Sequence, residues 1–432
     1  MSKELISGWG RNPIIEAQLA TPTQPEQIDI SSINGIPRGM GRSYGDSALA
    51  DQIISMQQID SFISFNEKSG ELHCAGGTTL DEILKVFVPK GWFLSVTPGT
   101  KFVSLGGAIA SDVHGKNHHK VGSFCDHLSS IKLLLASGEA VSCSPTQKSD
   151  LFHATCGGMG LTGIIISATI KLIPIKSTVI NQQTLKAANL KEVFELFEAN
   201  YHSTYSVAWI DCLASGKNLG RSLLYLGEHD ENSSFEMQSG REKSIPFDMP
   251  TTLLNRFTIQ AFNTLYYRKV CDRVSRQQVH YEPYFYPLDS LQHWNRLYGR
   301  HGFLQYQFVI PKRAGLEGMT QILKRISASK KGSFLAVLKE LGRQNSNLLS
   351  FPMEGYTLAL DFKWESDLLQ LLNELDQIVL EYGGHIYLTK DARMSEATFK
   401  ESYPRWEQFM EIRHKYGATE HFNSLQSKRL GL

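Results

Sequence analysis

The run from Pro98 to His119, PGTKFVSLGGAIASDVHGKNHH, brings glycines, histidines and a carboxylate together in a short stretch. Its glycines let the backbone approach a ligand at distances where a Cβ would clash. A helix that opens over residues 106–112 would direct its free backbone N–H groups at an anion in front of it. We therefore expect this run to cradle a cofactor, with a pyrophosphate as its anionic part.

Two further glycine clusters flank this run. The first, PRGMGRSYGD at residues 37–46, adds Arg38 and Arg42, whose charge suits phosphate recognition together with the loop amides. The second, CGGMGLTGIII at residues 156–166, spells a dinucleotide fingerprint, but an alternating strand-like run follows it where that fingerprint needs a helix. One such cluster is typical of a tight turn, whereas three in the first part of the chain favour a nucleotide-type cofactor.

The order of these motifs resembles the FAD-binding half of the vanillyl-alcohol-oxidase superfamily, and within it the family of decaprenylphosphoryl-β-D-ribose 2-oxidases, flavin subunits of a ribose 2-epimerase. Later blocks continue the resemblance over nearly the whole chain, at residues 206–211, 265–269, 294–298, 305–311, 334–339 and 387–393. It implies an α+β fold: a two-lobed FAD-binding domain and a substrate-binding cap built on an antiparallel sheet with helices. The expected domains are residues 1–176 for FAD, 177–388 for the cap, and 389–432 as a segment returning to the FAD domain.

The resemblance implies that residues of the glycine clusters, and a few residues near them, contact the flavin. These positions are Gly39, Gly41, Arg42, Ser43, Tyr44, Gly99, Thr100, Val103, Gly106, Gly107, Ala108, Ser111, Asp112, His114, Gly115, Asn117, His118, Gly160, Gly163, Ile164 and Tyr387. Several superfamily members attach FAD through a histidine in the first glycine loop. Residues 38–46 contain neither histidine nor cysteine, so we expect noncovalent FAD.

The resemblance also implies a catalytic group of Lys390, His114 and Tyr44. Lys390 lies in YLTKDAR, which matches the family's essential lysine motif. Its cation would stabilise negative charge on the reduced flavin, or burial would deprotonate it to act as the base for a sugar hydroxyl; the sequence leaves both roles open. His114 is expected to hydrogen-bond the flavin ring or the reacting hydroxyl. We expect no metal at His114, His118 and His119, because no carboxylate or cysteine stands in suitable company.

Substrate recognition is carried over to Trp209, Gln305, Gln307, Lys339 and Lys390. Gln305 and Gln307 lie two apart on an expected strand, so both amides face one side and can meet sugar hydroxyls. Lys339 is expected to contact the phosphate or the sugar. The chain departs from the family pattern at three positions, where an asparagine, a cysteine and a tyrosine are replaced by Thr357, Ala359 and Phe285.

Composition excludes several other classes of protein. A chain of 432 residues should form two or three domains, and 44 basic against 43 acidic residues give no global signature of nucleic-acid binding. The six cysteines show no CxxC pair, so neither a zinc site nor a disulfide framework is indicated. No signal peptide or membrane-spanning apolar run is apparent. We expect a cytoplasmic protein, peripheral at the inner membrane face.

Periodicity predicts the elements that position these residues. Residues 228–285 lack clear periodicity and are predicted to form a long functional or disordered loop. Strands are expected at 52–64, 72–75, 127–136, 164–172, 205–211, 304–310 and 356–362. Helices are expected at 79–88, 190–199, 316–327, 367–382 and 404–414.

These residues predict FAD-dependent oxidation of the C2 hydroxyl of a polyprenylphosphoryl ribofuranose, the first half of epimerisation to the donor for cell-wall arabinan. The chain lacks a qualified nicotinamide motif, so a separate NAD(P)H-dependent short-chain reductase is expected as partner. The lipid-borne substrate requires membrane access, for which the 228–285 segment is the expected docking surface. Two alternatives stay open: oxidation of a soluble sugar, alditol or aldonolactone, and a non-catalytic flavin-binding protein, against which Lys390 and His114 argue.

Overall fold

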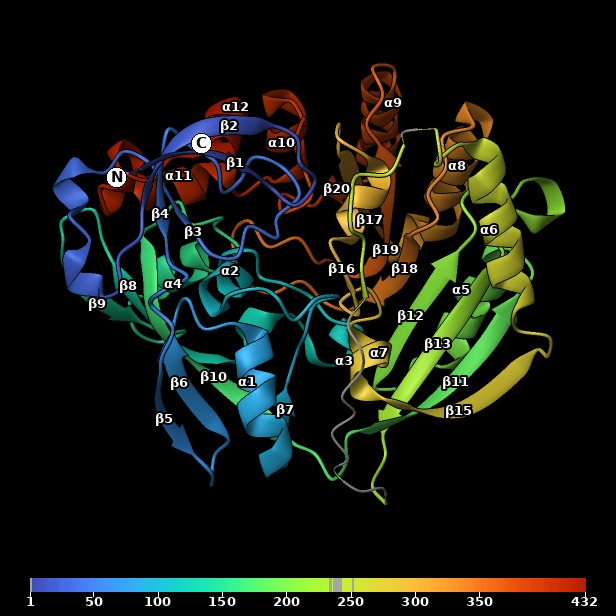
Figure 1. Ribbon diagram of the computed structural model, residues 1–432, viewed down its shortest axis with the longest axis horizontal. Helices are drawn as coiled ribbons and strands as arrows, with labels where there is room; N and C mark the ends of the chain where they lie inside the picture. Colours follow the sequence, from blue (N-terminus) through green and yellow to red (C-terminus); the bar gives the residue numbers. More distant parts are fainter. Residues whose placement is uncertain (1, 233–234, 236–242, 251) are drawn as a thin grey trace.

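The computed structural model describes residues 2–232, 235, 243–250 and 252–432 (Figure 1). The described part of the chain contains three large sheets. Two of them lie in the N-terminal part beside the C-terminal helices, and the third carries the middle of the chain (Figure 1). This arrangement confirms the predicted α+β class.

The two N-terminal sheets form the two lobes expected of the FAD-binding part. The first has the order β1-β2-β4-β3, with strands Ser2–Ser7, Ile14–Ala20, Ile36–Arg38 (β3) and Gln52–Ser55 (β4). The second has the order β5-β6-β10-β8-β9, and β7 pairs with the end of β10. Its strands are Phe62–Asn66 (β5), Glu71–Ala75 (β6), Trp92–Leu94 (β7), Leu128–Leu134 (β8), Ala140–Cys143 (β9) and Ile164–Pro174 (β10).

Local sequence signals explain the helices of these lobes. Thr79 caps α1 (Leu80–Phe87) through a reciprocal capping box with Glu82, and the apolar face of α1 is buried in the second lobe. Ser104 caps α2 (Leu105–Ala110) by accepting from the backbone of Gly107. Two short helices, α3 (His118–Val121) and α4 (Ser149–Thr155), complete this part. The third glycine cluster directly precedes β10, which confirms that it is not a dinucleotide fingerprint.

The third sheet is antiparallel throughout, in the order β15-β11-β13-β12-β18-β19-β17-β20. Its strands are Val179–Ala187 (β11), Tyr205–Ile210 (β12), Ser222–His229 (β13), Val274–His280 (β15), Phe303–Pro311 (β17), Ala336–Leu341 (β18), Gly355–Lys363 (β19) and His385–Ile386 (β20). The antiparallel cap sheet is therefore confirmed. Whether its folding unit spans 177–388 stays a prediction.

Alternation along the cap strands separates a helix-covered face from a cavity face. Helices α5 (Leu190–Ala199), α8 (Gly315–Ser329) and α9 (Leu368–Glu381) pack on one face (Figure 1). Tyr306 and Phe308 of β17 are buried in that layer, whereas Gln305 and Gln307 of the same strand line the cavity on the other face. The period of two along a strand thus turns both glutamines toward the FAD-binding lobes.

The prediction of one long irregular segment at 228–285 is wrong for much of its length. Asn255 caps helix α6 (Arg256–Arg268), and strand β15 and helix α7 (Tyr281–Phe285) follow it. The apolar residues of α6 are spread around the helix, several of them exposed, so no single stripe marks it in the sequence. A short pair, β14 (Lys243–Ser244) with β16 (Leu291–Gln292), lies nearby. Residues 233–234, 236–242 and 251 of this segment lie outside the described residues.

The C-terminal helices return to the N-terminal lobes (Figure 1). They are α10 (Glu396–Ser402), α11 (Trp406–Lys415) and α12 (Leu425–Leu430). The backbone of Gly35 donates to His421 at 2.9 Å, and the buried guanidinium of Arg413 donates to the carbonyls of Leu161 and Phe422. Among the helices of the described residues, none has both the length and the apolar character needed to cross a bilayer.

Candidate active site

A cavity of about 1350 Å³ lies between the FAD-binding lobes and the open face of the cap sheet. All three glycine clusters contribute to its wall, as do residues from seven strands of the cap sheet. Cofactor and ligand sites usually measure about 300–1000 Å³. The cavity therefore has room for a dinucleotide and for a second ligand beside it.

The glycine clusters form a part of the cavity wall in which side chains on the glycines would clash with neighbouring groups or occupy the cavity. A Cβ at Gly39 would lie 2.0 Å from the Ser104 hydroxyl, and Gly41 has a φ of +62°. At Gly99, a Cβ would meet no heavy atom of the described residues within 4 Å, because this loop faces open space. This bare backbone fits a flat, phosphate-bearing cofactor such as FAD.

The helix after the central glycines does not offer the free N–H groups that its sequence predicts. Leu105 donates to the carbonyl of Thr78 at 2.8 Å, Gly106 donates to Gly76 at 2.7 Å, and Gly107 donates to the Ser104 hydroxyl at 3.2 Å. Because the protein itself satisfies these three donors, a pyrophosphate would have to use other amides of the glycine loops. The expectation of free N–H groups at this helix N-terminus is therefore wrong, whereas the place of the cofactor's anion stays a prediction.

Most of the expected cofactor residues line the cavity. They are Gly39, Gly41, Arg42, Ser43, Tyr44, Gly99, Thr100, Val103, Gly106, Gly107, Ala108, Ser111, His114, Gly160, Gly163 and Tyr387. Five others lie behind the wall formed by the described residues: Asp112, Gly115, Asn117, His118 and Ile164.

The residues behind the wall bond to protein groups instead. Asp112 accepts from the amide of Asn345 at 2.8 Å, and it also accepts from the Asn347 and Ser350 side chains. His118 accepts from the backbone of Gly342 at 3.0 Å and bonds the Ser123 hydroxyl through its other ring nitrogen. These contacts assign Asp112 and His118 to support of the loop. Among the described residues, no group of histidines, cysteines and carboxylates could hold a metal ion.

Lys390 reaches the cavity beside the first glycine cluster. Its ammonium lies 4.0 Å from the ring centroid of Tyr44. Burial lowers the pKa of Lys390 to about 7, with Asp361 opposing this shift and Lys339 adding to it. An amine with a pKa near neutrality can serve either as a cation or as a base, so both roles predicted for it remain chemically accessible.

The segment carrying Lys390 is fixed to the first glycine cluster. The backbone of Tyr44 donates to the carbonyl of Thr389 at 3.0 Å, and a Cβ at Gly45 would lie 2.0 Å from the Asp391 carbonyl oxygen. Arg429 of α12 binds Asp46 and Asp391 together, at 2.8 Å each. The ion triad therefore holds the lysine turn against the loop that supplies Tyr44.

His114 and Gln307 form a buried pair on the cavity wall. The amide nitrogen of Gln307 donates to His114 Nε2 at 3.0 Å and to the Thr357 hydroxyl at 3.2 Å. Burial, with Lys339 nearby, holds the pKa of His114 well below its ordinary value. The imidazole is therefore neutral at physiological pH, and its Nε2 accepts a hydrogen bond.

The remaining predicted substrate residues also line the cavity. The indole of Trp209 donates to the carbonyl of Phe334 at 3.2 Å, and its ring lies 4.7 Å from that of Tyr266 on α6. Burial lowers the pKa of Lys339 to about 8. Trp209 thus forms the wall toward α6, and Lys339 brings a basic side chain to the cavity wall from β18.

Two functional candidates escaped the sequence analysis. Lys116 lines the cavity, contacts the carbonyl of Tyr284, and has a pKa that burial lowers to about 7. Asp361 accepts from Gln305 at 2.5 Å, and burial raises its pKa to about 7. The position of Lys116 within the HGKN motif was a usable signal. Asp361 gave none, because its role depends on pairing β19 with β17.

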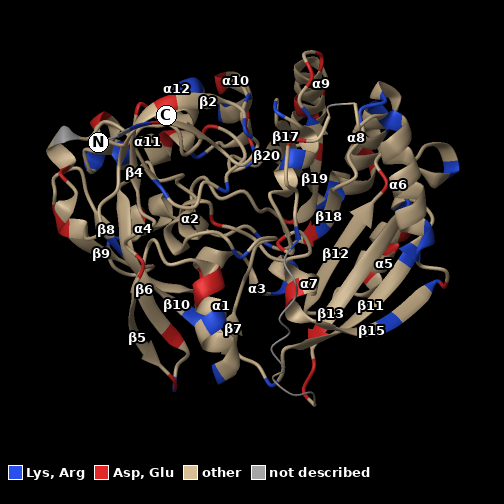
Figure 2. Ribbon diagram, in the orientation of Figure 1, with Lys and Arg blue, Asp and Glu red and all other residues tan. Residues whose placement is uncertain are grey.

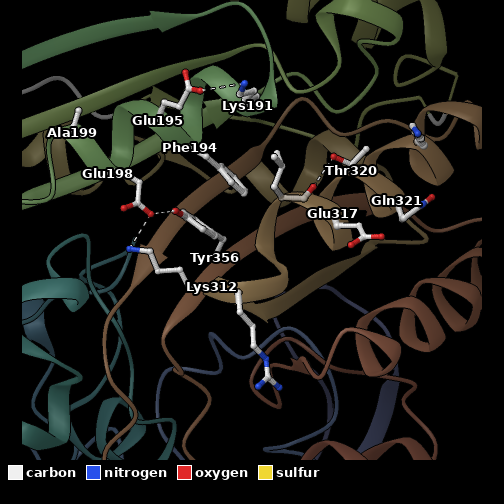
Figure 3. Close-up of a pocket in the computed structure, with 13 residues that line it drawn as sticks. Lys191, Phe194, Glu195, Glu198, Ala199, Lys312, Glu317, Thr320, Gln321 and Tyr356 are labelled. Carbon is white, nitrogen blue, oxygen red and sulfur yellow. Dashed lines mark hydrogen bonds and ion pairs between the residues drawn. The ribbon is translucent and has the colours of Figure 1, made fainter.

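A second hollow lies on the helix-covered face, between α5 and α8 (Figure 3). Phe194 and Tyr356 stack in it with ring centroids 3.9 Å apart. Lys312 pairs with Glu198 at 3.0 Å and with Glu340 at 2.8 Å. These charges are met within the protein, so the hollow offers no evident site for the predicted chemistry.

Comparison with known proteins identifies the family of the chain and its FAD-binding part. Residues 28–144 match the FAD binding domain model. The chain is 36% identical to decaprenylphosphoryl-beta-D-ribose oxidase of Mycolicibacterium smegmatis over 99% of this chain and 97% of that protein. It is 28% identical to an uncharacterized protein from the mprA 5' region of Streptomyces coelicolor, over 82% of this chain and all of that protein. The chain belongs to the family of FAD-dependent oxidoreductases typified by the Mycolicibacterium enzyme.

Proposed function

We propose that this chain oxidises the C2 hydroxyl of a polyprenylphosphoryl-β-D-ribofuranose to the 2-keto sugar, the first half of epimerisation to the arabinose donor. The observation that carries the proposal is the joint placement of Lys390, Gln305, Gln307 and Lys339 around one cavity large enough for FAD and a sugar. The named Mycolicibacterium relative supports this substrate class.

The chain's own residues divide the work of this reaction. Bound FAD would supply a two-electron acceptor for the hydride that leaves C2. Lys390 lies beside Tyr44, where it would either take up the proton of the C2 hydroxyl or stabilise developing negative charge. Gln305 and Gln307 would orient the sugar hydroxyls. The cap sheet and the α6 side would exclude water from this step.

The substrate's phosphodiester needs cationic partners. Lys116 and Lys339 both line the cavity, and burial lowers the pKa of each, to about 7 and about 8. A bound phosphodiester would raise these pKa values again, because an opposite charge favours the ammonium form. We therefore assign the phosphate to the neighbourhood of these two lysines.

The first glycine cluster predicts noncovalent flavin. Neither Arg42 nor its neighbours at 38–46 offer a histidine or cysteine for attachment. Acid precipitation of the yellow protein should therefore leave the flavin in the supernatant. Colour that stays with the precipitated polypeptide would contradict noncovalent binding.

A separate NAD(P)H-dependent short-chain reductase would complete the epimerisation by reducing the 2-keto sugar from the opposite face. The glycine motif at residues 158–163 leads into β10 and not into a helix, so it does not supply a nicotinamide site. The keto product would pass to that partner.

Helix α6 is the proposed contact with the inner face of the membrane. Phe257 and Leu265 are 78% and 71% exposed, while Phe262 and Tyr266 of the same helix line the cavity. Lys and Arg residues also gather along α6 and β15 (Figure 2). Exposed apolar side chains next to cations are typical of helices that lie on anionic bilayers. A lipid tail could therefore remain in the bilayer while its sugar enters the cavity.

Replacing Phe257 and Leu265 together by aspartate should weaken binding to vesicles containing anionic lipid on the order of 100-fold, taking about 1.5 kcal/mol for each buried side chain. Sedimentation with vesicles measures this. The matched control is Leu5→Asp, a change at a β1 residue that is 79% exposed and does not line the cavity. Equal vesicle binding by both variants would contradict a role for α6.

The substrate proposal is tested by comparing compounds as reductants of the bound flavin under anaerobic conditions. A short-chain prenylphosphoryl ribose should bleach the flavin, whereas free ribose, an alditol and an aldonolactone should do so slowly or not at all. Faster bleaching by a soluble sugar or lactone would move the substrate to that class. Flavin that no sugar reduces would point to a non-catalytic binding protein.

A further inference from the structure

Asp361 is a buried carboxylate directly behind the sugar-facing wall. It is 2% exposed and lies on β19, where Gln305 of β17 is its cross-strand partner. Its backbone N–H donates to the Ser333 hydroxyl at 3.1 Å, so its position is fixed from β19. Gln305 lines the cavity, whereas Asp361 lies outside the wall formed by the described residues. The carboxylate can therefore act on a ligand only through its neighbours.

The carboxylate determines which end of the Gln305 amide faces the cavity. The amide nitrogen donates to Asp361 Oδ1 at 2.5 Å. Gln305 also lies near enough to Tyr44 to oppose the rise that burial causes in the pKa of the phenol. The ionised form of Asp361 only accepts hydrogen bonds, and in that form it holds the amide nitrogen of Gln305 toward itself, as the structure shows. The carbonyl oxygen of Gln305 is then the group left for a ligand.

The side-chain amide of Gln307 has the same orientation as that of Gln305, but other residues hold it. Its amide nitrogen is engaged by His114 and Thr357, which leaves its carbonyl oxygen for a ligand as well. Two acceptors at alternate positions of one strand suit two neighbouring hydroxyl groups that donate. An amide turned the other way would offer a donor, so the hydroxyl would have to accept and its own proton would need another partner.

The charge of Asp361 also acts on the cavity. The ionisable groups around it are Lys390, Tyr44 and Tyr298. Lys339 of β18 acts on Lys390, and Lys390 in turn acts on His114 of the central glycine run. The carboxylate opposes the fall that burial causes in the pKa of Lys390. Because the charge of each group shifts the pKa of the other, the two titrate as an interacting pair.

We propose that Asp361 is a positioning residue for the oxidation: it holds the Gln305 carbonyl oxygen toward the substrate hydroxyls and balances the charge of Lys390. This inference rests on the proposed function in that it requires a hydroxylated substrate beside Lys390. It does not depend on which sugar is oxidised.

The first test is Asp361→Asn, measured by anaerobic flavin reduction across a range of pH. Loss of the carboxylate lets Gln305 turn and removes the charge that raises the pKa of Lys390. We expect a rise in the apparent substrate Kd and a fall in the limiting reduction rate, each on the order of 10-fold. The inflection that reports Lys390 should also move to lower pH, whichever role the lysine plays.

A second variant exchanges the two groups. In Asp361→Asn combined with Gln305→Glu, the new amide donates to the new carboxylate, whose second oxygen again offers an acceptor to the substrate. The double variant should recover substrate affinity and most of the shift in the pH profile relative to Asp361→Asn alone. The exchanged pair keeps one amide and one carboxylate in contact. Recovery of activity in the double variant would therefore show that the single variant did not simply fail to fold.

The matched control is Asp376→Asn, which removes a buried carboxylate of α9 that pairs with Arg393. It should lower the melting temperature without moving the pH profile. An unchanged profile and unchanged substrate Kd in Asp361→Asn, or no recovery in the double variant, would overturn the inference. The proposed function fails separately, when prenylphosphoryl ribose does not reduce the flavin of the wild-type protein.

Discussion

Lys390→Ala is expected to abolish reduction of the bound flavin by substrate while FAD stays bound. Lys390 is the ionisable group that meets Tyr44 at the cavity wall, 4.0 Å from its ring. Removing a positioned acid–base or charge-stabilising group typically slows the chemical step by about 10²–10⁴-fold. Stopped-flow absorbance of the flavin measures the rate, and the visible spectrum before mixing reports FAD content.

The exposed lysine Lys324 of α8 provides the control, since Lys324→Ala should reduce flavin as the wild type does. Lys390→Arg then separates the two roles. An arginine retains a cation but does not act as a base, so substantial activity would favour charge stabilisation and loss of activity would favour proton removal. Full activity in Lys390→Ala would contradict any part for this lysine in the chemistry.

Arg429→Met is expected to lower the free energy of unfolding by about 3 kcal/mol, because it leaves two buried carboxylates without their shared partner. Asp46 and Asp391 have side chains that are 7% and 1% exposed, and both bind this guanidinium. Urea unfolding followed by circular dichroism measures the loss. Flavin reduction should also slow, since the triad fixes the turn that carries Lys390.

The pH dependence of this effect has a defined sign. Burial acts to raise the pKa of Asp391, but Arg429 and Arg393 together hold it below its ordinary value. A carboxyl with a lowered pKa contributes stability above its unfolded pKa of about 3.9, and this contribution is lost as the pH falls through the lower folded value. Burial raises the pKa of Asp46 even with Arg429 present, and loss of Arg429 would raise it further. The difference between wild type and Arg429→Met should therefore be largest at neutral pH and begin to shrink above about pH 4 as the pH falls. A difference that grows in acid would contradict the triad's role.

The elements with strong periodicity were predictable from sequence. The helix at 79–88 has its cap and one apolar stripe, and the strands at 304–310 and 356–362 alternate or run apolar between turn signals, so local physics determines each of them. Helix α6 was missed because it keeps apolar residues such as Phe257 exposed. Its exposed apolar residues lie on several sides of the helix, so the sequence shows no single stripe with the helical period.

Site residues that lie in recognisable motifs were predictable from the sequence, whereas residues that reach the site only through strand pairing were not. Lys390, His114 and the two glutamines stand in matched motifs, and all four line the cavity. Asp361 becomes relevant only when β19 pairs with β17 in one register. Conversely, Asp112 and His118 stand in the strongest motif, yet several of their partners come from residues 342–350, more than 200 residues away. Sequence spacing could not distinguish a wall residue from its support.

The most direct test of the central claim is anaerobic stopped-flow reduction of the flavin by prenylphosphoryl ribose carrying deuterium at C2. Hydride transfer from C2 predicts a primary isotope effect on the bleaching rate. This isotope effect should persist across the pH range in which Lys390 titrates. Oxidation at C2 would be contradicted if the deuterated and ordinary substrates bleached the flavin equally fast in a step shown to be chemical. It would also be contradicted if deuterium at another carbon slowed the bleaching.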